Sequence, residues 1–281
     1  MPPRPAPKRT TPQRTTPQRI APPPLLLLAA SLLILFLALP VATLLLRAVR
    51  PEVLGALTLP TAIDALRLSL LTTSLTLVLT LLLGTPLAYL LARYTFPGKR
   101  LVEALVDLPV VLPPVVAGVA LLLVFGRRGL LGAPLAEAGI NLAFTTTAVV
   151  LAQLFVASPF YVRALKVAFA AVPRSVEEAA RIDGADQLGA IRHVTLPLAL
   201  PGMIEGSVLA WARALGEFGA TIVFAGSTAG RTRTMPLEIY AALERDLDAA
   251  IATSGLLAVA AFALFLAVRL TGRASEPPTA P

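Results

Sequence analysis

The sequence has no cysteine, a single histidine and few charged or aromatic residues. The absence of cysteine excludes disulfide bonds, thiolate metal sites and cysteine nucleophiles. Charged residues occupy 14% of the 281 positions and aromatic residues 6%, whereas soluble domains carry about 25% charged residues. A water-soluble globule is therefore excluded.

Motifs of nucleotide-binding and hydrolytic enzymes are also missing. No Gly-x-x-x-x-Gly-Lys-[Ser/Thr] loop occurs, because Gly98-Lys99 is followed by Arg100, so the chain has no phosphate-binding loop of its own. Neither His-Glu-x-x-His nor Gly-x-Ser-x-Gly is present, which argues against a protease or hydrolase. We expect a protein that is not an enzyme and holds no metal or cofactor itself.

Long apolar segments dominate what is present. The mean hydropathy is +0.79 and 56% of positions are hydrophobic, which favours membrane helices over the short alternating strands of a barrel. The pattern predicts an all-α polytopic membrane protein with six transmembrane helices, at residues 25–46, 66–92, 102–125, 142–171, 198–225 and 249–270.

The ends of the chain differ in composition from the apolar part. Residues 1–24 are rich in Pro, Thr, Gln and Arg, which predicts a disordered basic tail before a transmembrane domain at 25–270, and residues 271–281 form a second disordered tail. A cleaved signal peptide is the alternative interpretation of segment 25–46, but no clear small-x-small cleavage site follows it.

Basic residues indicate the orientation. The connections on the side of the termini carry fifteen Lys and Arg and those on the other side carry eight. This bias predicts a protein of the cytoplasmic (inner) membrane with both termini in the cytoplasm. The basic tail is then a topology signal beside lipid, and no nucleic-acid partner is expected.

The longest cytoplasmic connection contains a loop, residues 172–196, that reads as two short helices. Ser175 and Glu178 have the spacing of a capping box for the first helix. Gly184 provides a stop, and Asp186 can cap a second helix that runs toward Pro197. Two stiff helices could receive force from another protein, although a solvated loop with well-capped helices is an equal alternative from these local rules alone.

This loop resembles the permease subunits of ATP-binding cassette (ABC) importers. Their signature is Glu-Ala-Ala, three residues, Gly, nine residues and Ile-x-Leu-Pro, and this sequence has Val194 in place of Ile. The other matching residues, which the resemblance assigns to ATPase coupling, are Glu178, Ala179, Ala180, Gly184, Leu196 and Pro197. It implies a type I importer permease fold, a homodimer, two ATPase subunits that bind ATP and Mg, and an external binding protein.

Further segments look like those of molybdate or tungstate permeases. They are 95–99, 108–118, 126–129 and 216–221. Sulfate and thiosulfate permeases are close relatives, but Gly-Arg-Arg-Gly at 126–129 and Phe-Gly-Ala-Thr at 218–221 favour the molybdate branch. The resemblance implies import of a tetrahedral oxyanion, most closely molybdate, with sulfate as the alternative.

The same segments carry features that suit a translocation pathway. Prolines interrupt the third apolar segment, and irregular backbone at membrane depth needs protein or water as partner. Arg213 and Glu217 stand four residues apart, where they can neutralise each other. We predict a pathway and gate formed by Pro113, Pro114, Gly118, Arg213, Gly216, Glu217, Gly219 and Thr221. A simple kink and a self-satisfied ion pair are the structural alternatives.

Four arginines on the predicted outer side could attract an anion or an acidic partner. They are Arg127, Arg128, Arg231 and Arg233. The alternative is that they snorkel to the lipid headgroups.

Two other functions remain open from the sequence. An ATP-independent channel or secondary transporter would carry internal repeats and buried coupling carboxylates, and apart from Asp107 and Glu205 few membrane acids occur. A membrane scaffold without transport would not need residues 175–195 for ATPase association.

Overall fold

The computed structural model describes residues 23–273, and within them it contains helices and no strand. This confirms the all-α prediction. The chain divides into two units, residues 1–43 and 44–281. In the first unit the described residues are the start of α1 (Pro24–Ala48), and their side chains are exposed. Of the predicted tails, Pro24 lies in α1 and residues 271–273 lie in α13; residues 1–22 and 274–281 lie outside the described part.

The second unit holds the other elements. In chain order they are α2 (Pro51–Leu54), a 3-10 turn (Gly55–Thr58), α3 (Pro60–Arg93), α4 (Lys99–Val111), α5 (Pro114–Phe125), α6 (Gly132–Glu137), α7 (Thr146–Ala171), α8 (Arg174–Ile182), α9 (Gln187–Ala190), a π-helical segment (Ile191–Thr195), α10 (Leu196–Leu215), α11 (Gly219–Phe224), α12 (Met235–Leu243) and α13 (Leu247–Arg273).

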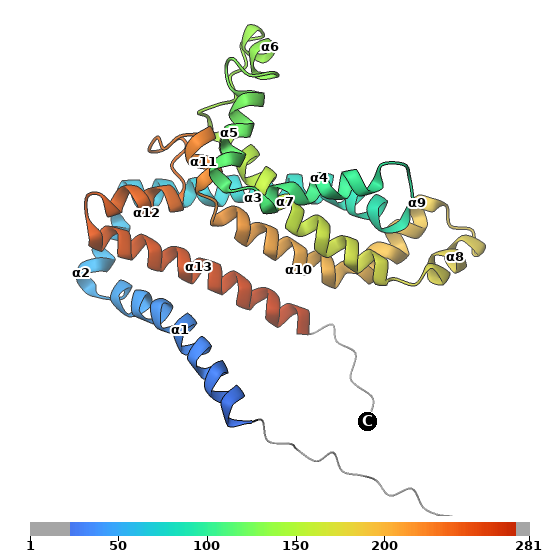
Figure 1. The fold of residues 1–281 in the computed structure, drawn as a ribbon, viewed down its shortest axis with the longest axis horizontal. Coiled ribbons are helices and arrows are strands. Elements are labelled where there is room, and N and C mark those ends of the chain that lie inside the picture. Colours follow the sequence, from blue (N-terminus) through green and yellow to red (C-terminus); the bar gives the residue numbers. More distant parts are fainter. Residues whose placement is uncertain (1–22, 274–281) are drawn as a thin grey trace, which may run out of the picture. The chain divides into compact units, whose positions relative to one another are not determined.

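The packed centre of this unit is formed by α3, α7 and α10, which run side by side (Figure 1). The buried face of α3 carries small and polar residues at helical spacing, including Ser69, Thr76 and Thr80, whereas Leu82 and Leu83 are more than 60% exposed. Thr76 donates to Gln153 on α7 at 3.1 Å. Small residues inside and leucines outside are typical of helices that pack within lipid.

Four helical stretches within residues 23–273 are long and apolar enough to cross a membrane: α1, α3, α7 and the continuous helix Gln187–Leu215. The pair α4 and α5 makes a fifth if it counts as one span. These agree with the first, second and fourth predicted spans. The count of six remains a prediction that depends on α13.

Two predicted spans are broken. The segment 102–125 is not one helix, because α4 and α5 are bent by 119° at Leu112 and Pro113. Pro113 and Pro114 have no N–H, so the carbonyls of Pro109 and Val110 lose their i+4 partners there. The segment 198–225 is also interrupted, since α10 ends at Leu215 and α11 begins at Gly219.

Candidate functional site

The predicted cytoplasmic loop folds as two short helices, α8 and α9, that lead into α10. Gly184 lies just after the end of α8 and has a φ of +96°, a conformation that favours glycine. The Asp186 carboxylate accepts from the Gly189 N–H at 2.8 Å and so caps α9, as predicted. The π-helical segment connects α9 to α10 without a break, and Pro197 lies in the first turn of α10.

The predicted capping box at the start of α8 is wrong. The helix begins at Arg174, directly after Pro173, whose backbone already has the extended conformation of an N-cap residue. Ser175 therefore lies inside the first turn, and the N-cap makes no side-chain hydrogen bond. The Glu178 side chain is exposed instead of bound to the cap.

Three apolar side chains are exposed on this loop among charged ones. Ile182 is 85% exposed, Leu188 is 70% exposed and Val176 is 39% exposed. Glu178 and Ala179 of the signature are exposed beside them. No residue of α8 is buried. Exposed apolar side chains therefore stand next to charged ones on this loop.

Sequence reasoning missed Glu177, the residue before the signature. Its side chain is 13% exposed and forms an ion pair with Arg93 at 2.7 Å, and the Arg93 side chain is 7% exposed. Thr195 donates to the same carboxylate oxygen at 2.7 Å. Arg93 and Glu177 lie 84 residues apart in the sequence, and only the fold brings them together.

The two breaks in the predicted spans meet in space. The N-terminal part of α5 packs on α11 so closely that a Cβ on Gly219 would lie 2.6 Å from the Cβ of Pro114. A Cβ on Gly118 would lie 2.9 Å from the carbonyl oxygen of Ala220. Pro114 and Gly118 of the third segment and Gly219 of the fifth therefore lie at one contact between helices, which we call the α5–α11 junction.

Glu217 holds this junction on the side of α10. Its buried carboxylate is 1% exposed, pairs with Arg213 at 2.7 Å and accepts from the Ala220 N–H at 2.7 Å. Gly216 closes α10, because its N–H still bonds to Ala212 while the next residues leave the helix. The Thr221 hydroxyl is buried and has no hydrogen-bond partner among residues 23–273.

Substituting Gly219 with valine should disrupt the α5–α11 junction. Because the new Cβ would overlap Pro114 and approach the Val115 backbone nitrogen at 3.3 Å, backbone must move, and overpacking of this kind costs about 1–3 kcal/mol. We expect a lower unfolding temperature in detergent. Gly216→Val serves as control, since its nearest neighbour would be 3.6 Å away; equal destabilisation by both variants would contradict the packing of the junction.

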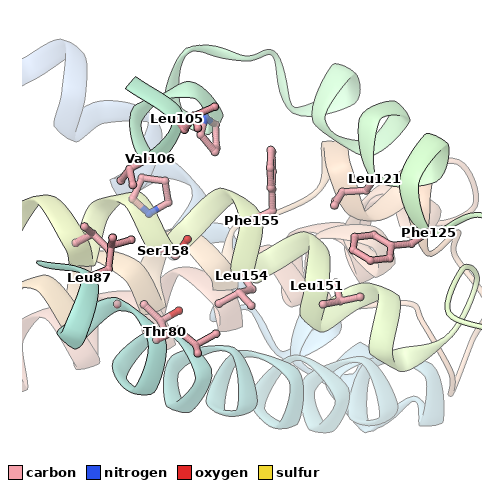
Figure 2. Close-up of a pocket in the computed structure, with 15 residues that line it drawn as sticks. Thr80, Leu87, Leu105, Val106, Leu121, Phe125, Leu151, Leu154, Phe155 and Ser158 are labelled. Atoms are coloured by element: carbon pink, nitrogen blue, oxygen red, sulfur yellow. The ribbon is translucent and has the colours of Figure 1, made fainter. Parts of the chain in front are cut away.

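A cavity lies under the bend between α4 and α5. Its volume is about 360 Å³, and Phe155 projects from α7 between the two helices (Figure 2). Its lining is apolar except for Thr80 and Ser158, and the Thr80 hydroxyl has no partner in the described part of the chain. The lining contains no charged residue, so the cavity does not suit an inorganic anion.

The four predicted outer arginines differ in their surroundings. Arg127, Arg128 and Arg231 are exposed. Arg233 is bound internally, since it pairs with Glu238 at 3.3 Å and donates to the hydroxyl and carbonyl of Ser227, both at 3.1 Å. Only the first three are therefore free to meet a ligand. Within residues 23–273, no group of three or more His, Asp or Glu residues could hold a metal ion.

The sequence is similar to those of known transport proteins. A family model for a binding-protein-dependent transport system inner membrane component matches residues 84–274. The molybdenum transport system permease protein ModB of Mycobacterium tuberculosis is 48% identical over 235 residues, or 84% of this chain and 89% of its own length. Sulfate permease 2 of Chlamydomonas reinhardtii is 41% identical over 203 residues, covering 72% of this chain and 55% of its own length.

Two solved structures share the fold. A bacterial ABC transporter that imports alginate has a chain with a TM-score of 0.71 at 19% identity, covering 90% of this chain and 95% of its own. The MetNI methionine ABC transporter has one with a TM-score of 0.59 at 21% identity, covering 76% and 96%. These likenesses confirm the predicted importer permease fold.

Proposed function

This chain belongs to the family of binding-protein-dependent transport system inner membrane components, and we propose that it is the permease subunit of an ATP-driven importer for molybdate or tungstate. The proposed complex contains two copies of the chain, two cytoplasmic ATPase subunits that bind ATP and Mg, and an external oxyanion-binding protein. The permease itself catalyses no reaction.

One observation carries the coupling part of this proposal. The spacing from Glu178 to Pro197 falls on a two-helix loop whose first helix has no buried residue and exposes Ile182 at 85%. Burial of this side chain against an ATPase groove would remove its apolar surface from water, which is favourable. Glu178, Ala179, Ala180 and Gly184 therefore form the proposed ATPase contact, with Leu196 and Pro197 joining it to α10.

We place the translocation pathway and gate beside the α5–α11 junction. The carbonyls of Pro109 and Val110 have no i+4 N–H because of Pro113 and Pro114, and free carbonyls are not tolerated in hydrocarbon. This part of the bend must then face water, other residues of this chain or a second subunit. Gly118, Gly216, Gly219 and Thr221 allow the two broken helices to lie there, and Glu217 fixes them.

Charge along the proposed route suits an anion. Arg213 is 28% exposed and keeps guanidinium N–H groups beyond the one that faces Glu217. On the proposed outer side, the exposed Arg127, Arg128 and Arg231 would attract an oxyanion or an acidic surface of its binding protein. Arg233 supports that side through Glu238.

Energetics support coupling to ATP instead of passive conduction. Moving a dianion inward against an inside-negative potential costs about 4.6 kcal/mol per 100 mV, since each charge costs about 2.3 kcal/mol. An ATP-independent channel or a scaffold does not meet this requirement.

The bias of arginine and lysine residues supports an orientation with both termini in the cytoplasm.

Cargo is tested by transport competition. In vesicles that carry the full complex, we measure uptake of radiolabelled molybdate with an unlabelled competitor present at about a hundredfold excess over the Kd for molybdate. We expect molybdate or tungstate to lower uptake by more than about tenfold, and sulfate at the same concentration to lower it by less than about twofold. The greater identity to the M. tuberculosis ModB than to the sulfate permease supports this choice. Equal competition by sulfate would favour the sulfate importer.

A further inference from the structure

The coupling helix α8 is attached to the membrane helices mainly through polar contacts. None of its residues is buried, so an apolar core does not fix its position. Its most enclosed side chain is Glu177, 13% exposed. One oxygen of this carboxylate accepts from Arg93 at the end of α3 and from Thr195 just before α10, both at 2.7 Å.

Arg93 adds two further links at the same point. Its Nη2 also donates to the carbonyl of Val172, between α7 and α8, at 3.0 Å. Its own carbonyl accepts from Arg174, the first residue of α8, at 3.1 Å. The Arg93 side chain is 7% exposed, so water competes little for these bonds. The group Arg93, Glu177 and Thr195, which we call the Arg93 cluster, thus joins α3, α8 and the start of α10.

We propose that the Arg93 cluster is the link that transmits movement of α8 to α3 and α10, and that Glu177 is its positioning residue. This inference rests on the proposed function of α8 as the ATPase contact. The docking residues Ala179 and Ile182 face outward, whereas Glu177 faces the bundle. A force on the exposed face reaches two membrane helices through one partly buried carboxylate, and α3 and α10 both pack on α7.

Substitution of Glu177 tests this role. Glu177→Gln keeps the size of the side chain and can still accept a hydrogen bond from Thr195. It leaves the Arg93 side chain without a counter-ion, and loss of one partner strongly destabilises such an ion pair. In proteoliposomes with the ATPase subunits and the external binding protein, we expect molybdate uptake to fall about tenfold while ATPase association and hydrolysis stay within about twofold. ATP consumed per molybdate then rises about tenfold. An unchanged ratio, whether both rates persist or both fall, would overturn the proposal.

A matched variant and a rescue separate this role from simple loss of stability. Glu103→Gln breaks the ion pair of Glu103 with Lys166, 3.1 Å long and also between two helices, and should leave the ratio within about twofold. Exchanging the pair in Arg93→Glu with Glu177→Arg should recover uptake to within about threefold of the native complex. A ratio raised equally by Glu103→Gln would overturn the assignment.

Hydrogen exchange of the permease alone tests the link without any ATPase. We expect Glu177→Gln to speed amide exchange in α8 by about tenfold and to leave α7 unchanged. Unchanged exchange in α8 would overturn the proposal. If the native complex showed no ATP-dependent uptake, the proposed function would fail, and this exchange result would still decide whether the cluster holds α8.

Discussion

Replacing Ala179 by tryptophan should abolish oxyanion uptake by the reconstituted importer. Ala179 is exposed on α8, beside Ile182, so the larger side chain does not disturb the permease itself. It would occupy the centre of the proposed ATPase contact, where a poorly fitting residue costs more than about 2 kcal/mol of association. We expect uptake to fall by about 30-fold or more, with loss of ATPase co-purification.

Arg100→Trp is the control for this variant. Arg100 is exposed in the first turn of α4, on the same proposed side of the membrane. It is not part of the signature. Its replacement should leave uptake within about twofold, as for most surface changes. If Ala179→Trp transported molybdate at the native rate, α8 would not be the ATPase contact.

Removing the carboxylate of Glu217 should have the second-largest effect. Glu217→Ala leaves Arg213 without its counter-ion and the Ala220 N–H without its acceptor, at a position that is 1% exposed. Loss of one partner from a fully buried ion pair costs about 3–5 kcal/mol, and the cost is smaller here because the Arg213 side chain is 28% exposed. We expect a lower unfolding temperature and loss of uptake, because the α5–α11 junction loses its support from α10.

Glu205→Ala is the matched control on the same helix. The Glu205 side chain is exposed, and no ion pair holds it in the described residues. Its removal should change the free energy of unfolding by less than about 0.5 kcal/mol. Combining Glu217→Ala with Arg213→Met should recover stability, since the unpaired charge is then absent. Continued instability of that double variant would show that the Ala220 contact, not the ion pair, is decisive.

Much of the coupling loop could be predicted because its signals are local. The Gly184 stop and the Asp186 cap each depend on residues within one turn. The Ser175 cap failed because Pro173 starts the helix earlier. Glu177 was missed because its partner Arg93 lies 84 residues away, and no local pattern indicates that pair.

The broken spans show a similar limit. Prolines in the third segment correctly indicated irregular backbone, but they do not fix the direction of the chain after the break, which the contact of α5 with α11 determines. The end of α10 at Leu215 was not expected, because the Arg213 and Glu217 spacing suits a continuous helix. The ion pair forms nevertheless, since Glu217 lies just beyond the helix end.

The most direct test of this account measures uptake with and without the ATPase partner. Vesicles containing the permease, the ATPase subunits and the external binding protein should accumulate radiolabelled molybdate only when ATP and Mg are enclosed on the cytoplasmic side, and vesicles lacking the ATPase should accumulate none. Equal accumulation in vesicles without the ATPase, or none in the complete complex with ATP, would contradict it.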